Sequence, residues 1–285
     1  MQTDDRLLAL PADHPGVSDL AYRARRAAIA AAGEGHRPGD PIAEVAYAPE
    51  EDAVWRTVSA ELAVLHETYA VAAYRDGAAR LALPGAVVPQ LAAVSARLTD
   101  LTGWAITPVP GLVPTRTFYE SLGERRFCST QYIRHHSVPF YTPEPDVVHE
   151  LIGHANALAE PRLAGLYELA GQAARRSTTD AALEALSRIF WFSLEFGVCR
   201  EGGALRTYGA GLLSSYGEIQ AFRSAEIRPL DVRAMATLDY DITRYQPVLF
   251  AADSFAHAYE VLATTFAGWD DDAHQRLVGG GGPPS

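Results

Sequence analysis

Two histidines that lie five residues apart, His149 and His154, constrain this chain more than any other feature. Glu150 lies between them, so the segment comes close to the zinc-protease pattern, in which the two histidines are four residues apart. On an α-helix, residues four apart differ by about 40° around the axis, whereas residues five apart differ by about 140°. The pair can reach one ion only at a helix end or beside a π-bulge. We therefore expect a metal site where a helix emerges from the turn at Pro143 and Pro145.

The composition is that of a globular protein. The chain has 285 residues, is 48% hydrophobic and carries a formal net charge of −11, which argues against nucleic acid as a partner. Its two cysteines, Cys128 and Cys199, are too few for a disulfide framework. The sequence shows neither the layout of a signal peptide nor an apolar run long enough to span a bilayer. We expect a cytoplasmic protein without membrane contact.

Periodicity and turn residues predict a mainly α-helical fold with a few short β-strands. Residues 106–113 and 127–135 have strand character, and residues 208–217 are typical of a glycine- and serine-rich loop. We expect an extended segment over residues 1–13, one domain over 14–275 and a disordered tail over 276–285. The predicted helices cover residues 17–33, a stretch that begins at Pro49 and Glu50, and residues 146–158, 161–176, 180–199 (with Thr178 or Thr179 as N-cap) and 254–267.

A catalytic metal needs a third protein ligand, and Glu195 is the best placed. It lies among aromatic and apolar residues, where a carboxylate is costly to bury unless it is paired or coordinated. Ser187, Trp191 and Glu195 follow at i,i+4 spacing and would line one stripe of a helix. Two imidazoles and one carboxylate form the facial triad of non-haem Fe(II) oxygenases. From the residues alone, an ion pair between Glu195 and an arginine, with both histidines in the core, remains an alternative.

Arg134 and the segment from Gly209 to Ser214 are candidates for holding a small polar ligand. Arg134 lies in a weakly charged segment just before the metal site, where it could bind a substrate carboxylate bidentately; an ordinary surface arginine is the alternative. The Gly209–Ser214 segment lacks the third glycine of a dinucleotide loop and follows a helix, which excludes that interpretation. Its approachable backbone and the hydroxyls of Ser214 and Ser215 suit a small polar ligand.

Three long strings of residues carry a family resemblance. FCSTQYIRHHSVPFYTPEPDVVHELIGH, FWFSLEFGVC and LRTYGAGLLSSYGEIQAF are similar to the tetrahydropterin-dependent aromatic amino acid hydroxylases, and the likeness runs from His14 to Phe255. It implies the catalytic domain of that family, with Fe(II) and tetrahydrobiopterin as cofactors and O2 as a reactant. The resemblance is nearer to the animal enzymes than to the common bacterial ones. Their regulatory domain and tetramerisation helix have no counterpart, so a monomer is expected.

The resemblance also implies a role for each matching position. His149, His154 and Glu195 become the iron ligands, and Glu150 is a catalytic residue that reaches the pterin through water. Arg134 holds the carboxylate of the amino acid. The full set of positions expected to bind the amino acid is Arg134, Thr142, Pro145, Trp191, Phe196, Gly211 and Ser214. The set expected to lie around the pterin is Gly111, Leu112, Thr115, Phe118 (stacked on its ring), Cys128, Ser187 and Phe190.

Several positions depart from the animal pattern near the pterin and the substrate ring. Cys128 stands where a histidine is usual, Phe190 where a tyrosine is usual and Ser187 where an alanine is usual. Such changes would influence which ring carbon is attacked. Trp191 is the residue type of the phenylalanine and tyrosine hydroxylases, and Ile242 stands where an acid would indicate tyrosine, so L-phenylalanine is the expected substrate.

The expected product is either meta-tyrosine or para-tyrosine, with equal weight. Meta-tyrosine would fit a branch of the family that serves natural-product biosynthesis. Three alternatives stay open: a tryptophan hydroxylase of the same family, a zinc-dependent hydrolase with Glu150 as base, and a catalytically silent protein that binds aromatic amino acids. Metal analysis would separate the hydrolase from the hydroxylase, and iron content with pterin oxidation would decide against or for the silent protein.

Overall fold

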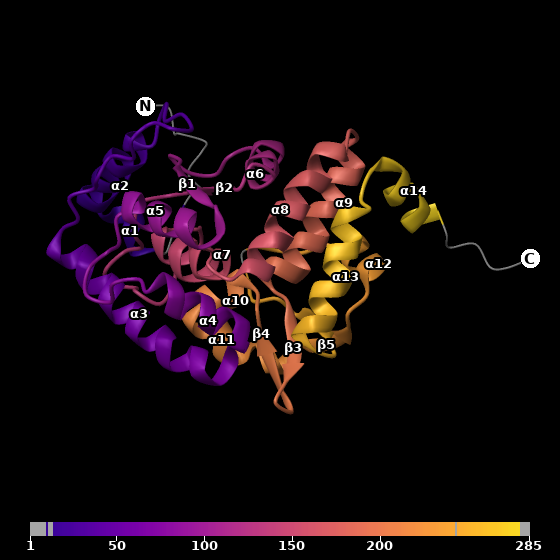
Figure 1. Ribbon diagram of the computed structural model, residues 1–285. Coiled ribbons are helices and arrows are strands. Elements are labelled where there is room, and N and C mark those ends of the chain that lie inside the picture. The colour runs from indigo at the N-terminus through magenta and orange to yellow at the C-terminus, as the bar shows by residue number, and fades with distance from the viewer. Residues whose placement is uncertain (1–9, 11–13, 243, 280–285) are drawn as a thin grey trace, which may run out of the picture.

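The computed structural model describes residues 10, 14–242 and 244–279, and helices dominate this part of the chain (Figure 1). The α-helices are α1 Pro15–Ser18, α2 Leu20–Ala32, α3 Pro49–Tyr69, α4 Ala72–Leu81, α5 Leu91–Thr102, α6 Thr115–Leu122, α7 Asn156–Leu158, α8 Pro161–Arg176, α9 Asp180–Phe190, α10 Ala210–Ser214, α11 Tyr216–Ala221, α12 Val232–Thr237, α13 Phe255–Ala267 and α14 Asp271–Gly279. Two π-turns, η1 His149–Ala155 and η2 Trp191–Glu195, and one 3₁₀ turn, η3 Phe222–Ser224, complete the helical elements.

The strands are short and form two small sheets within the described residues. β1 Ala105–Pro108 pairs in parallel with β2 Arg126–Ser129. The second sheet has the order β4-β3-β6-β5, in which only β3 and β4 are antiparallel. Its members are β3 Val198–Glu201, β4 Ala204–Thr207, β5 Glu226–Pro229 and β6 Val248–Ala252. The expectation of a mainly α-helical fold with a few short strands is confirmed.

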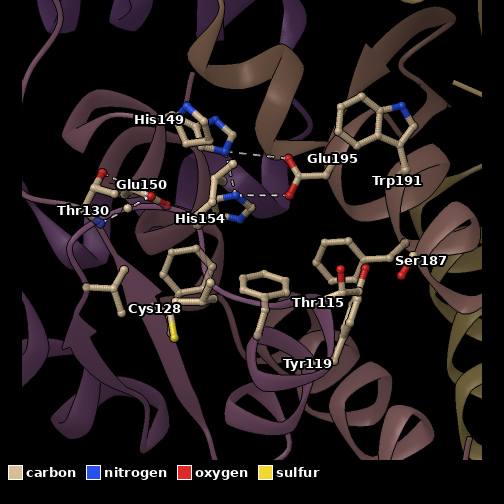
Figure 2. Close-up of a pocket in the computed structure, with 18 of the residues that line it drawn as sticks. Thr115, Tyr119, Cys128, Thr130, His149, Glu150, His154, Ser187, Trp191 and Glu195 are labelled. Atoms are coloured by element: carbon tan, nitrogen blue, oxygen red, sulfur yellow. Dashed lines mark hydrogen bonds and ion pairs between the residues drawn. The ribbon is translucent and has the colours of Figure 1, made fainter. Parts of the chain in front are cut away.

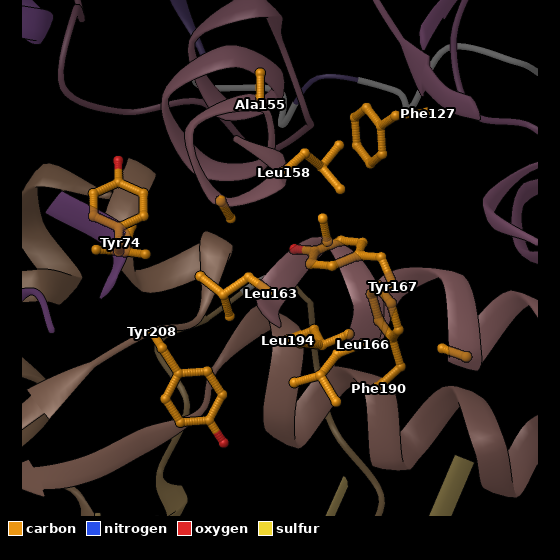
Figure 3. Packing of buried hydrophobic residues seen from close by; sticks show 14 of the residues in the cluster. Tyr74, Phe127, Ala155, Leu158, Leu163, Leu166, Tyr167, Phe190, Leu194 and Tyr208 are labelled. Carbon is orange, nitrogen blue, oxygen red and sulfur yellow. The ribbon is translucent and has the colours of Figure 1, made fainter. Parts of the chain in front are cut away.

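Helix α8 lies at the centre of the core and supports the site. It packs against α6 and α13, and Figure 1 shows α8, α9 and α13 side by side. Gly171 allows the close approach to α6, because a Cβ there would lie 2.0 Å from the backbone nitrogen of Gly123. Tyr167 of α8 packs with Phe190 and Leu194, two residues of the chain segment that leads to Glu195 (Figure 3). No helix among the described residues is long and apolar enough to cross a membrane.

Several predicted boundaries are confirmed. Helix α3 begins at Pro49, α8 spans the expected residues 161–176, and Thr179 caps α9 by accepting a hydrogen bond from the amide of Ala182. The predicted helix over 180–199 is wrong beyond Glu195, because Cys199 lies in β3.

Two other predictions need correction. The expected loop over residues 208–217 contains α10 and the start of α11, since its glycines serve close packing between backbones. The expected tail is helical over residues 276–279, which belong to α14. The rest of that tail, residues 280–285, and the expected extended segment over 1–13, apart from residue 10, lie outside the described residues.

Candidate active site

The π-turn η1 brings the two histidines together, as their spacing predicts. The amide of Asn156 donates to the carbonyl of Leu151, five residues back, so residues five apart become neighbours along the turn. The Nε2 atoms of His149 and His154 lie 3.0 Å apart. Gly153 lets η1 approach α10, because a Cβ there would lie 2.8 Å from the carbonyl oxygen of Ala210. The convergence that an ordinary α-helix would prevent is achieved by the local π geometry.

A second π-turn, η2, presents Glu195 to the same point. The amide of Phe196 donates to the carbonyl of Trp191, again five residues back, at 2.9 Å. Glu195 Oε1 lies 3.2 Å from His154 Nε2, and Oε2 lies 3.9 Å from His149 Nε2. Figure 2 shows these three side chains pointing toward one another. The ligand set predicted from the sequence is brought together.

The hydrogen bonds of the histidines leave both Nε2 atoms directed at the shared point. Ser214 Oγ donates its single hydrogen to the carbonyl of Ala210 at 2.8 Å. The same oxygen lies 2.8 Å from His149 Nδ1, so in this second contact it accepts the imidazole N–H. His149 then has its lone pair on Nε2. His154 Nδ1 lies 2.9 Å from the hydroxyl of Tyr167. Such partners on the far ring nitrogen are typical of metal-bound histidines.

The charges of the site also suit a cation. Burial lowers the pKa of His149 to about 4, which keeps this imidazole neutral. Burial opposes ionisation of Glu195, but the neighbouring His154 outweighs burial and lowers the pKa of Glu195, while Glu195 in turn raises the pKa of His154 against burial. The site offers one anionic carboxylate and two imidazoles whose Nε2 atoms lie about 3 Å apart. That separation is expected for adjacent ligands of an ion with metal–ligand bonds of about 2.1 Å. The donor set therefore fits a non-haem Fe(II) ion.

Glu150 also lies near the histidines, within 4.8 Å of their nitrogens, but it points elsewhere. Its Oε1 accepts hydrogen bonds from the amide and the hydroxyl of Thr130 at 3.4 and 3.3 Å, and Figure 2 shows it turned toward Thr130. Burial raises the pKa of Glu150 to about 8. The side chain of Glu195, rather than that of Glu150, lies close to both Nε2 atoms, which makes Glu195 the candidate third ligand.

Two cavities meet at this metal-binding triad. The α6-side cavity, of about 550 Å³, contains every position expected around the pterin. Phe118 lies at 6.0 Å from both Phe127 and Phe190 between ring centroids, each in an edge-to-face contact. The lining that corresponds to the predicted set is Gly111, Leu112, Thr115, Phe118, Cys128, Glu150, Ser187 and Phe190.

The α10-side cavity, of about 350 Å³, contains every position expected around the amino acid. Those positions are Arg134, Thr142, Pro145, Trp191, Phe196, Gly211 and Ser214. Trp191 stacks on Tyr240 with centroids 4.3 Å apart, and lies 4.6 Å from Phe196. Leu112, Pro145, His149, Trp191 and Glu195 line both cavities and form their common wall, whereas His154 lines the α6-side cavity.

The guanidinium of Arg134 is paired with a protein carboxylate, a contact that the sequence alone did not predict. Its Nε and Nη2 donate to the two carboxylate oxygens of Asp146 at 2.9 and 2.7 Å, and both side chains are buried. Its Nη1 has only a long contact, 3.4 Å, with the carbonyl of Pro139. Asp146 therefore fixes one edge of the guanidinium and leaves the Nη1 side for a ligand in the cavity.

Sequence reasoning missed the partners that support these side chains. Tyr167, Asp146, Thr130 and Tyr240 come from separate elements, and only Asp146, three residues before His149, had a signal in its position. Tyr119 was also missed, although it lines the α6-side cavity and its ring lies 5.3 Å from that of Phe190. Tyr119 lies in α6, far from Phe190 in the sequence, so no local pattern indicates this contact.

Comparison with known proteins agrees with this arrangement. Residues 5–268 match the family model of the biopterin-dependent aromatic amino acid hydroxylases. A phenylalanine 3-hydroxylase from Streptomyces coeruleorubidus is 46% identical over 267 residues, which cover 94% of this chain and 96% of that protein. The rat phenylalanine-4-hydroxylase is 40% identical over 90% of this chain, but the match spans 57% of the rat protein.

Solved structures show the same fold. The phenylalanine hydroxylase from Chromobacterium violaceum, with bound oxidised Fe(III), superimposes with a TM-score of 0.78 at 30% identity, over 90% of this chain and 92% of the other. The Legionella pneumophila phenylalanine hydroxylase gives a TM-score of 0.75 at 29% identity, over 84% and 98% of the two chains. The family overturns the zinc-hydrolase alternative. The chain belongs to the biopterin-dependent aromatic amino acid hydroxylases and is a pterin-dependent monooxygenase.

Proposed function

We propose that this enzyme hydroxylates the ring of L-phenylalanine with O2 and a tetrahydropterin, and that it attacks the meta position. The observation that carries the proposal is the meeting of two cavities, one lined by aromatic residues and one by Arg134 and hydroxyls, at His149 and Glu195, with His154 on the aromatic-lined side. A ternary site of this kind holds two organic molecules against one metal ion.

His149, His154 and Glu195 would hold the Fe(II) ion, which when bound supplies the activation of O2. Ser214 and Tyr167 orient the two imidazoles through their Nδ1 atoms. The rest of the protein's contribution is to orient the two organic molecules and to exclude water from the buried triad. Glu150 lines the α6-side cavity and would reach the pterin through water.

The α10-side cavity would take the amino acid. Nη1 of Arg134 would donate a charge-assisted hydrogen bond to the carboxylate, with Thr142 and Ser214 lining the cavity beside it. The aromatic ring would lie against Trp191 and Phe196, with Pro145 closing the pocket. Gly211 leaves backbone exposed beside them. This places the ring next to Glu195 and therefore next to the metal.

The α6-side cavity would take the pterin, stacked on Phe118. Gly111, Leu112 and Thr115 lie at the edge of this cavity, where backbone groups and one hydroxyl would bind the polar ring edge. Cys128, Ser187 and Phe190 would complete the wall. Burial raises the pKa of the Cys128 thiol, which makes this residue a neutral wall group rather than a nucleophile.

Attack at the meta position is favoured by the 3-hydroxylase from Streptomyces coeruleorubidus, which matches this chain over nearly its whole length at 46% identity. Para attack is the second candidate, because the 4-hydroxylases match at 40–42% identity. A role in natural-product biosynthesis follows from the meta assignment. We also propose a cytoplasmic monomer in which both buried cysteines stay reduced.

The test is a reaction of the Fe(II)-reconstituted protein with L-phenylalanine, tetrahydrobiopterin and air, with the three tyrosine isomers separated by chromatography. We expect meta-tyrosine as the main product. Para-tyrosine as the main product would contradict the regiochemical proposal and keep the enzyme class. Oxidation of the pterin without any tyrosine would contradict phenylalanine as the substrate, and L-tryptophan and L-tyrosine serve as comparison substrates.

A further inference from the structure

The π-turn that joins His149 to His154 releases one backbone carbonyl from its usual partner. In an α-helix the carbonyl of Ile152 would accept the amide of Asn156, four residues on. Here that amide donates to Leu151 instead. The carbonyl of Ile152 accepts the hydroxyl of Tyr74 at 2.6 Å and the side-chain amide of Asn156 at 3.2 Å. We propose that Tyr74, with Asn156, is the positioning residue that holds η1 in π geometry and so sets the metal affinity. This inference rests on the proposed iron site.

The hydrogen bonds favour the π-turn over an α-helical turn in a specific way. Tyr74 is fully buried and Asn156 is buried, and the Asn156 side-chain amide also lies 3.2 Å from the Tyr74 oxygen. In an α-helical register, the amide of Asn156 would be a third donor to the carbonyl of Ile152, whose two lone pairs already accept the Tyr74 hydroxyl and the Asn156 side-chain amide, so one of these buried donors would lose its acceptor. A buried donor without an acceptor is destabilising. Tyr74 therefore stabilises the register in which the two histidines share one face.

Helix α4 is held firmly enough to impose this geometry. Gly77, one turn after Tyr74, packs against the backbone of Asn156, where a Cβ would lie 2.4 Å from the carbonyl oxygen. The ring of His66 meets Tyr74 edge-to-face, with centroids 5.0 Å apart. His66 Nε2 in turn donates to the carbonyl of Leu213 at 2.7 Å, next to the serine that binds His149. Tyr74 thus belongs to the same packed block as the support of the first histidine.

The test compares two variants that each lose one phenol hydroxyl. Tyr74→Phe removes the hydrogen bond to Ile152. Tyr47→Phe is the matched control, because its hydroxyl also donates to a backbone carbonyl, at 2.7 Å, but to Gln131, which is not a residue of η1. Both proteins and the unmodified chain are titrated with Co(II), and the dissociation constant, the visible d–d spectrum and the melting temperature without metal are recorded.

Both variants should melt about 2–4 °C lower, as expected for one lost hydrogen bond in a chain of this size. Only Tyr74→Phe should bind Co(II) more weakly, by about tenfold, with a shifted d–d spectrum, as when the support of metal ligands is lost. Equal Co(II) affinity and an unchanged spectrum in Tyr74→Phe would overturn the inference and leave Tyr74 a purely structural residue. Equal weakening in both variants would overturn it too.

Two further arms keep the outcomes separate. If Tyr74→Phe does not fold, Asn156→Ala is titrated, and an unchanged Co(II) affinity there would overturn the inference. If the unmodified chain itself does not bind Co(II), the proposed function fails at its metal site. Binding by the unmodified chain with no difference between the variants defeats the inference alone.

Discussion

The two cavities share His149 and Glu195 of the candidate metal site but are built differently. The α6-side cavity is lined by rings from regular elements, including Phe118 of α6 and Phe190 of α9, in edge-to-face contacts. The α10-side cavity takes Arg134 and Thr142 from segments outside helices and strands, and Ser214 from α10. Rings from packed helices give a rigid slot for a flat molecule. Directional hydrogen-bond donors give a site that orients a zwitterion. The following variants test this division of roles between the two cavities.

Loss of the common wall should have the largest effect, because it removes the point where the cavities meet. Glu195→Ala should abolish retention of iron and with it activity, since two imidazoles alone do not hold a catalytic ion. Metal content after desalting measures this. Glu150→Gln is the control and should keep its iron. Iron-replete Glu195→Ala, or loss of iron only from Glu150→Gln, would show that the ligand is assigned to the wrong carboxylate.

Arg134→Lys should weaken the α10-side cavity selectively. The expected loss is about 10- to 100-fold in affinity for L-phenylalanine, because one charge-assisted hydrogen bond contributes about 1.5–3 kcal/mol. Lysine keeps a positive charge beside the buried Asp146, which limits the loss of stability. Anaerobic calorimetry measures both ligands. An unchanged phenylalanine affinity, or an equal loss for the pterin, would refute the separation of roles.

Phe118→Leu should weaken the α6-side cavity selectively and by less. Aromatic contacts contribute about 0.5–1.5 kcal/mol beyond burial, so the affinity for the reduced pterin should fall about 2- to 12-fold. Phe140→Leu is the matched control, since Phe140 lines the α10-side cavity and packs on Tyr216 with centroids 4.2 Å apart. Equal pterin affinities in the two variants would contradict the placement of the pterin.

The smallest effect concerns pH and Glu218, a buried residue of the α10-side cavity. Burial raises its pKa to about 7, although it accepts the amide of Gln246 at 2.7 Å. The folded state therefore binds this proton more tightly, and its contribution to stability is complete below about pH 4.5 and is lost as pH rises to about 7. Glu218→Gln should make the melting temperature less dependent on pH between 5 and 8. An identical pH profile would contradict the raised pKa.

The metal site was predictable where its geometry is local. The five-residue spacing of His149 and His154 requires a π-bulge or a helix end, and η1 supplies the bulge. The second π-turn was not predictable, because it depends on residues distant in sequence. Gly209 packs so closely that a Cβ would lie 2.4 Å from the carbonyl oxygen of Glu195. The glycines that suggested a loop over 208–217 are therefore contact points for α10 against η2.

Side-chain partners were the least predictable part of the site. Asp146 holds Arg134, Tyr167 supports His154 and Tyr240 covers Trp191, and each pair joins separate elements. A sequence pattern indicates which face of a helix or strand is apolar, but it does not indicate which elements pack against each other. The family resemblance supplied the cavity positions, and the structure supplied the residues that hold them in place.

The most direct measurement is an anaerobic titration of the iron-loaded protein with L-phenylalanine and a tetrahydropterin, added in either order. The account predicts that one molecule of each binds at the same time, because the two cavities lie on either side of the wall formed by Leu112, Pro145, His149, Trp191 and Glu195. Competition between the two ligands, in which either one displaces the other, would contradict the two-cavity account.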